Sequence, residues 1–135
     1  MTFGIYSPLF VQTAMDQAPY PMLNRSAVII RPKQPYINWA SQLDNSHITP
    51  NQNNEPTIYL IPEYNDDSSA WAILEQIYDS IFDTELHAWH TETSDWPTNR
   101  TFEMFRDWFD ITFACEISDL GADPILDDAI IHPTE

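Results

Sequence analysis

The feature that most constrains the fold is an amphipathic helical pattern over residues 68–89. Large apolar side chains recur there at spacings of three and four: Trp71, Leu74, Ile77, Tyr78, Ile81, Phe82, Leu86 and Trp89. This spacing places them on one stripe of a helix, which predicts that the stripe is buried. After a Trp-Pro turn, residues 97–109 carry a second apolar set, at Phe102, Phe105, Trp108 and Phe109, which predicts a shorter helix that starts at Pro97.

Three other runs have strand character. Residues 26–31 and 57–61 are short, rich in β-branched or aromatic side chains, and each is followed by proline. Both therefore predict buried strands. Residues 111–117 alternate between apolar and polar or small side chains, a period of two that predicts a half-buried strand with Cys115 on its apolar face as a buried, inert thiol.

The order of these elements predicts the fold class. Residues 35–43 add a further helix between the first two strands, with Pro35 in its first turn. The resulting order is strand, helix, strand, helix, helix, strand. It predicts an α+β domain, with a small sheet of about three or four strands and helices packed mainly on one face.

The chain length of 135 residues fits one domain, and an aromatic content of 13 % argues against global disorder. We expect the α+β domain to cover residues 25–120. Residues 1–24 combine three prolines with apolar side chains and are expected to form an N-terminal arm. Residues 121–135 are expected to form an acidic C-terminal tail.

The charge balance limits the kinds of partner. The chain has 21 acidic and 5 basic residues, a net charge of −16, and eleven carboxylates but no Lys or Arg lie between Lys33 and Arg100. Such a surface repels nucleic acids and anionic membranes, and it speeds encounters with basic surfaces. We therefore expect no nucleic-acid binding. The alternative use of the charge is solubility alone.

Other sequence features point to a protein of the cytoplasm. Cys115 is the single cysteine, so no intramolecular disulfide is expected. The first basic residue is Arg25, whereas a secretory signal has positive charge before its apolar run. No stretch approaches the about 18 apolar residues of a membrane span. We expect a cytoplasmic protein without membrane association.

The first candidate site is a row of carboxylates on the long helix. Glu75, Asp79 and Asp83 follow at spacing four, and like charges at this spacing destabilise a helix by about 0.2–0.5 kcal/mol per pair. One hypothesis is that this face meets a basic surface of a partner or a divalent cation. The alternative is a solvated face whose small cost is offset by the apolar stripe.

The second candidate is His87 and His90 near the end of the same helix. Two imidazoles three residues apart share a helix face, and with a nearby carboxylate they could bind zinc. Metalloprotease motifs, however, place the two histidines four residues apart with a glutamate beside the first. The alternative is the favourable interaction of histidine with a helix C-terminus.

The third candidate is the Trp-Pro turn. Trp96 is the tryptophan expected to be exposed, and an exposed Trp among carboxylates suits a binding hot spot. Arg100 is the first basic residue after the acidic stretch. Its simplest role is an ion pair with an upstream carboxylate, and the alternative is an anion clamp in a pocket.

The residues W-P-T-N-R-T-F-E-M-F-R-D-W-F (96–109), with the strand after them and residues 59–63 before them, carry a family likeness. The chain resembles small acidic bacterial proteins of unassigned function over roughly residues 25–120. The resemblance implies that the Trp-Pro turn and the following helix are a structural signature. It implies no activity and no catalytic residue.

These observations favour an acidic interaction module that binds a basic protein partner, as an inhibitor, an immunity-type protein or a phosphate mimic would. Its expected partner-binding residues are Glu75, Asp79, Asp83 and Trp96. One alternative is a small metal-dependent enzyme or metal-binding protein that uses His87 and His90. Another is a structural homodimer, so the protein is expected to be a monomer or a homodimer. No catalytic residue and no cofactor are predicted, since two glycines provide no phosphate cradle.

Overall fold

The computed structural model describes residues 21–43, 50 and 55–127. The chain divides into two units, Asn24–Ile117 and a second unit made of Met1–Leu23 with Ser118–Glu135. All the helices and strands named below lie in the larger unit, Asn24–Ile117.

In the smaller unit, the described residues of the two chain segments pair with each other. Met22 and Ser118 form an isolated antiparallel bridge. The backbone N–H of Asp119 donates to the carbonyl oxygen of Pro21 at 2.8 Å. Most of the predicted arm, residues 1–20, and residues 128–135 of the predicted tail lie outside the described part of the chain.

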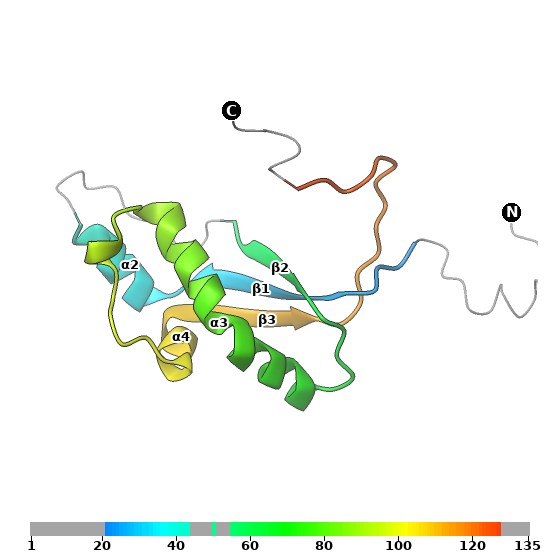
Figure 1. Cartoon of the computed structure of the whole chain (residues 1–135), viewed down its shortest axis with the longest axis horizontal. Helices are drawn as coiled ribbons and strands as arrows, with labels where there is room; N and C mark the ends of the chain where they lie inside the picture. Colours follow the sequence, from blue (N-terminus) through cyan, green and yellow to red (C-terminus); the bar gives the residue numbers. More distant parts are fainter. Residues whose placement is uncertain (1–20, 44–49, 51–54, 128–135) are drawn as a thin grey trace, which may run out of the picture. The chain divides into compact units, whose positions relative to one another are not determined.

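The sheet of the larger unit has three antiparallel strands (Figure 1). Strand β1 (Ser26–Pro32) lies in the centre, with β2 (Thr57–Ile61) and β3 (Phe109–Ala114) as its neighbours. The predicted α+β class is therefore confirmed, and the sheet has the lower of the two expected strand numbers. Central β1 is the most buried strand, as its run of apolar side chains predicts.

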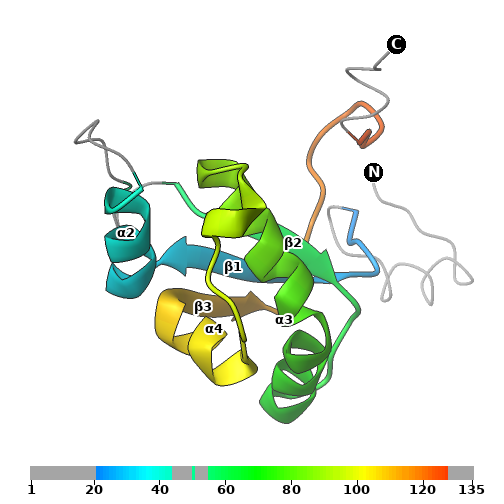
Figure 2. The same cartoon turned by 60° about the vertical axis from the view of Figure 1, so that its left-hand side comes forward.

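Three α-helices of the described residues pack with this sheet (Figures 1 and 2). They are α2 (Gln34–Ser41), α3 (Asp67–Trp89) and α4 (Phe102–Trp108), and a 3₁₀ turn, η1 (Thr93–Asp95), follows α3. Helix α3 begins where Asp66 caps it, because Asp66 Oδ1 accepts from the Ser69 N–H at 2.8 Å. Helices α2 and α4 lie toward the same end of the sheet in both views.

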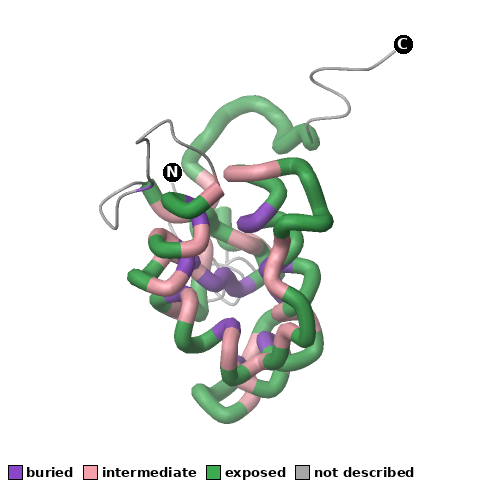
Figure 3. Tube along the Cα trace, turned by 90° about the vertical axis from the view of Figure 1, so that its left-hand side faces the viewer, coloured by how far each residue is buried: buried purple, intermediate pink, exposed green. Residues whose placement is uncertain are grey.

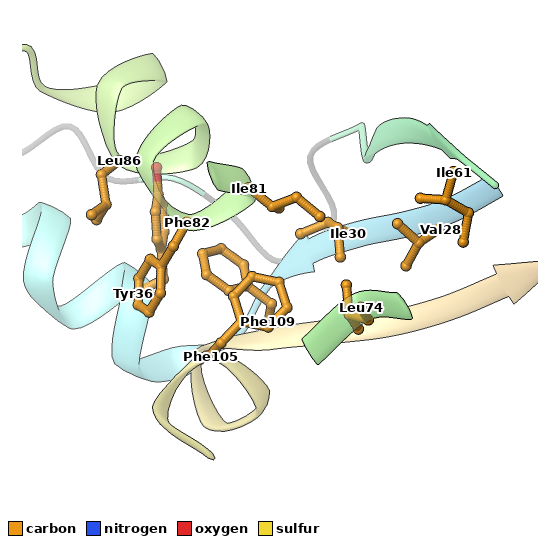
Figure 4. Close-up of a cluster of buried hydrophobic side chains, with 10 residues drawn as sticks. All are labelled: Val28, Ile30, Tyr36, Ile61, Leu74, Ile81, Phe82, Leu86, Phe105 and Phe109. Carbon is orange, nitrogen blue, oxygen red and sulfur yellow. The ribbon is translucent and has the colours of Figure 1, made fainter. Parts of the chain in front are cut away.

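The core forms on one face of the sheet. Alternation along the strands places Val28 and Ile30 of β1 on the same face as Ile61 of β2 and Phe109 of β3. These four join six buried side chains from the helices (Figure 4): Tyr36, Leu74, Ile81, Phe82, Leu86 and Phe105. Buried positions accordingly gather in the interior of the larger unit (Figure 3). The apolar stripe predicted for residues 68–89 is the side of α3 that enters this core.

The start of α4 differs from the prediction. The helix begins at Phe102 and not at Pro97, because the preceding residues follow a different backbone path. Asn99 has a φ of 55°, in the left-handed region that interrupts a right-handed helix. Thr101 then supplies the cap, since its Oγ1 accepts from the Met104 N–H at 3.1 Å.

The prediction for Cys115 is wrong. Strand β3 begins directly after α4 and ends at Ala114, three residues before the predicted end, because Ala114 pairs with Ala27 near the start of β1. Cys115 therefore follows the strand, and its side chain is exposed. Its carbonyl oxygen accepts from the Ser26 hydroxyl at 2.8 Å, which closes this end of the sheet.

Candidate interaction site

A hollow of about 570 Å³ lies between α3 and the loop that leads to α4. Helix α3 contributes Tyr78, Asp79 and Asp83, and the remaining lining comes from Thr93 and the loop residues Trp96, Pro97, Thr98, Asn99 and Arg100. The structure thus brings together three of the four predicted partner-binding residues: Asp79, Asp83 and Trp96.

Arg100 joins the two carboxylates of this hollow. Its Nη2 lies 3.0 Å from Asp79 Oδ1 and also donates to Asp83 Oδ1. The predicted ion pair with upstream carboxylates is confirmed, and it includes two partners. The anion-clamp alternative has no support here, since two carboxylates already face the guanidinium group.

The burial of the three charged groups is unequal. The Arg100 side chain is 15 % exposed, whereas those of Asp79 and Asp83 are 62 % and 51 % exposed. The guanidinium carbon lies 5.2 Å from the ring centroid of Phe82 and 6.0 Å from that of Trp96. Aromatic rings thus cover the arginine, and the carboxylates keep half or more of their side-chain surface in solvent.

Trp96 is half-buried, so the expectation of an exposed indole is wrong. Its Nε1 donates to the carbonyl oxygen of His90 at 2.8 Å, and its ring packs against the core cluster. This hydrogen bond draws the indole toward the end of α3. One side of the ring still lines the hollow beside Arg100.

The fourth predicted residue, Glu75, lines a second hollow one helical turn earlier. That hollow has a volume of 640 Å³ and is also lined by Thr101, Phe102, Glu103, Arg106 and Asp107. Arg106 lies over Trp71, with 4.5 Å from its guanidinium carbon to the ring centroid. The two hollows follow each other along α3, since Glu75 and Asp79 are one turn apart.

Together these hollows carry a negative surface. We call its five carboxylates, Glu75, Asp79, Asp83, Glu103 and Asp107, with the adjoining Trp96, the acidic face. Two guanidinium groups, those of Arg100 and Arg106, lie among the carboxylates. The negative groups therefore exceed the positive ones by three.

The structure gives His87 and His90 different neighbours. His90 Nε2 lies 2.9 Å from Asp95 Oδ2, and the His87 ring meets the Trp96 ring edge-on at a centroid distance of 6.5 Å. Among residues 21–43, 50 and 55–127, no three His, Cys, Asp or Glu side chains are grouped so as to hold a metal ion.

The sequence did not predict the buried polar cluster around Glu85. Glu85 lies within the core, where its Oε2 accepts from the Tyr59 hydroxyl at 2.5 Å and its backbone carbonyl accepts from the Tyr36 hydroxyl at 2.6 Å. Burial, and then the nearby Glu85 carboxyl group, raises the pKa of both tyrosines. The burial of Glu85 could have been predicted from its position. It follows Ile81 by four residues and so lies on the apolar stripe.

Comparison of the chain with protein-family models, with curated proteins and with solved structures finds no match. In the described part of the chain, no helix has both the length and the apolar character needed to cross a bilayer.

Proposed function

We propose that this protein is an interaction module whose acidic face binds a basic surface of a partner protein. The observation that carries the proposal is the pair Asp79 and Asp83, held by Arg100 beside Trp96 while both carboxylates remain at least half exposed. An inhibitor, an immunity-type protein and a phosphate mimic all fit this description.

The Arg100 bridge supports binding because it holds the two carboxylates in place before a partner arrives. A side chain that is already fixed loses little conformational freedom when a partner binds. Asp79 and Asp83 share one guanidinium group, so the three groups together carry one negative charge. A lysine or arginine of a partner would complete the neutralisation from the solvent side.

The surroundings of this pair support an extended contact. Glu75, Glu103 and Asp107 continue the negative potential along α3 and α4. A surface of one sign accelerates the encounter with an oppositely charged partner. The half-buried Trp96 offers a rigid aromatic wall of the kind that anchors protein interfaces.

Capture of partners at two ionic strengths tests the proposal. The immobilised protein is incubated with lysate of its source cell at about 50 mM and about 500 mM NaCl, where the Debye length falls from about 14 Å to about 4 Å. We expect a basic protein to be retained at the lower salt concentration and lost at the higher one.

The control for this experiment is Glu75→Lys, a change at an exposed position without a described ion pair. We expect this variant to retain less of the same basic protein at low salt. A retained protein that is equally bound by Glu75→Lys, or that stays bound at high salt, would speak for a contact elsewhere on the molecule.

A further inference from the structure

Strand β2 is an edge of the sheet and exposes apolar side chains. Within the described residues it pairs with β1 alone. Ile58 and Leu60 are 60 % and 51 % exposed, and they lie on the face opposite the core, beside Ile29 and Ala27 of β1. A strand edge with exposed apolar groups is a template for pairing with another extended segment.

Negative charges flank this edge strand on both sides, and the strand itself is uncharged. Residues 57–61 carry no charge, and an exposed glutamate lies two residues beyond each end, Glu55 before the strand and Glu63 after it. Charged groups that flank an apolar strand are a common protection against self-association. Their positions also predict that an added strand carries positive charges opposite these two glutamates.

A second copy of this chain fits the edge poorly in the symmetric register that pairs the whole of β2. A two-fold antiparallel pairing of β2 with itself, centred on Tyr59, sets Ile58 opposite Leu60 of the other copy. The same register, continued by two residues, sets Glu55 opposite Glu63 at both ends. Like charges directly opposite each other destabilise such a pair.

We propose that the outer edge of β2, which pairs with no strand among the described residues, accepts an extended segment of a partner protein as an added antiparallel strand. The segment places apolar side chains opposite Ile58 and Leu60 and a lysine or arginine opposite each of Glu55 and Glu63. Main-chain hydrogen bonds then supply affinity, and the charges supply register and selectivity. This surface is separate from the acidic face and does not depend on the function proposed for it.

A designed peptide tests the chemistry of the occupant. The probe Lys-Thr-Thr-Val-Thr-Val-Thr-Thr-Lys matches the register from Glu63 back to Glu55, and the matched control replaces both end lysines by glutamate. We expect the lysine-ended peptide to shift the amide resonances of β2 in NMR spectra and to bind about five- to tenfold more tightly than the control.

Reversing the charges at the two flanking glutamates provides a second arm of this test. The double variant Glu55→Lys with Glu63→Lys should prefer the glutamate-ended peptide, and Ile58→Glu should weaken binding of either peptide. No shift of β2 resonances at the solubility limit of the lysine-ended peptide would overturn the proposal. So would an end-charge preference that is unchanged in the double variant.

A second measurement needs no peptide. In the single variant Glu55→Lys, the introduced lysine lies opposite Glu63 of another copy at both ends of the self-paired strand. We expect this variant to dimerise in sedimentation experiments with a dissociation constant at least about tenfold below that of the unaltered protein. Adding Ile58→Glu, or Glu63→Lys, should return it to the monomer.

Two sedimentation results would contradict the proposal. One is the same sedimentation for Glu55→Lys and the unaltered protein, with near-UV circular dichroism showing that both are folded. The other is an unaltered protein that is already a dimer and that Ile58→Glu dissociates, since the glutamates would then not prevent self-pairing.

Discussion

Glu85 shows how a single polar residue is accommodated in this core. A buried carboxyl group is costly unless its oxygens accept hydrogen bonds. The Tyr59 hydroxyl on β2 donates to the side chain, and the Tyr36 hydroxyl on α2 donates to the backbone carbonyl of the same residue. Glu85 thereby links α3 to β2 and to α2, two elements distant in the sequence.

Removal of the Tyr59 hydroxyl should destabilise the fold. In Tyr59→Phe the Glu85 side chain loses its described donor while it stays buried, which costs about 1–3 kcal/mol. The measurement is the free energy of unfolding in urea at pH 7. Tyr64→Phe is the matched control, because the Tyr64 hydroxyl makes no hydrogen bond within the described residues, and its effect should stay below about 0.5 kcal/mol.

The same tyrosines predict sensitivity to alkali. Their pKa values are raised above the ordinary value of 10.0, so the folded state holds these protons more tightly than the unfolded chain does. The stabilisation is therefore complete below pH 10 and is lost as the pH rises further. We expect the free energy of unfolding to fall there by up to about 1.4 kcal/mol per pH unit and tyrosine.

Tyr59→Phe checks the origin of this alkaline loss. With one titrating tyrosine removed, its unfolding free energy should fall less steeply above pH 10 than that of the unaltered protein. Equal slopes for the two proteins would show that other groups titrate in this range.

At the scale of elements, the loop between α3 and α4 depends on Arg100. Asp79 and Asp83 are one turn apart on α3 and repel each other, and Arg100 brings the loop against them. The guanidinium group also lies over Phe82, so it connects the surface carboxylates to the core. Arg100 thus connects the loop to three positions of α3, and the Trp96 hydrogen bond to His90 adds a contact at the end of the helix.

Arg100→Ala should cost about 1–3 kcal/mol in the free energy of unfolding. It removes charge-assisted hydrogen bonds to two carboxylates and uncovers the Phe82 ring. Arg100→Lys should recover less than half of the loss, because an ammonium group cannot present two donors in a planar fork. Urea unfolding of the three proteins is the measurement, and a full recovery by lysine would exclude the geometric part of this explanation.

Much of the fold could be predicted at this scale because periodicity reports burial. The apolar stripe on residues 68–89 predicted the start of α3 to within one residue and its end at Trp89. The predicted strand 57–61 matches β2. The start of α4 could not be found by apolar spacing, since the cap at Thr101 and the left-handed Asn99 are local backbone features. The end of β3 depends on where its partner β1 begins, which spacing within residues 111–117 does not contain.

The sequence predicts that Arg100 forms an ion pair at the candidate site, but it does not show which carboxylates are its partners. An arginine after eleven carboxylates predicts an ion pair, and only the folded chain shows that Asp79 and Asp83 share it. Trp96 was expected to be exposed because it lies in a turn, but its Nε1 donates to the His90 carbonyl oxygen at the end of α3. Such a contact joins a loop to a helix end and leaves no periodic signal.

At the scale of the whole molecule, the net charge of −16 opposes compaction. Salt screens this repulsion, and it also screens the attraction between Arg100 and its carboxylates. With 21 acidic groups against 5 basic ones, repulsive pairs greatly outnumber attractive ones. The net effect of salt on the folded state should therefore be stabilising.

We expect added salt to raise the melting temperature. Between about 50 mM and about 500 mM NaCl, a gain of about 1 kcal/mol corresponds to about 4–8 °C for a domain of this size. Differential scanning calorimetry measures it, with sodium chloride and potassium chloride compared to separate screening from specific ion binding. A melting temperature that falls with salt would mean that attractive ion pairs dominate the stability.

The most direct test of the proposed function compares single charge reversals once a basic partner has been captured. Glu75→Lys and Asp107→Lys change the acidic face, and Glu116→Lys makes the same change of charge at an exposed position outside it. Affinities for the captured partner are measured by titration calorimetry at low salt. We predict a loss of about three- to tenfold for each of the first two variants and less than about twofold for Glu116→Lys. Equal losses for all three would show that net charge, and not the acidic face, determines binding.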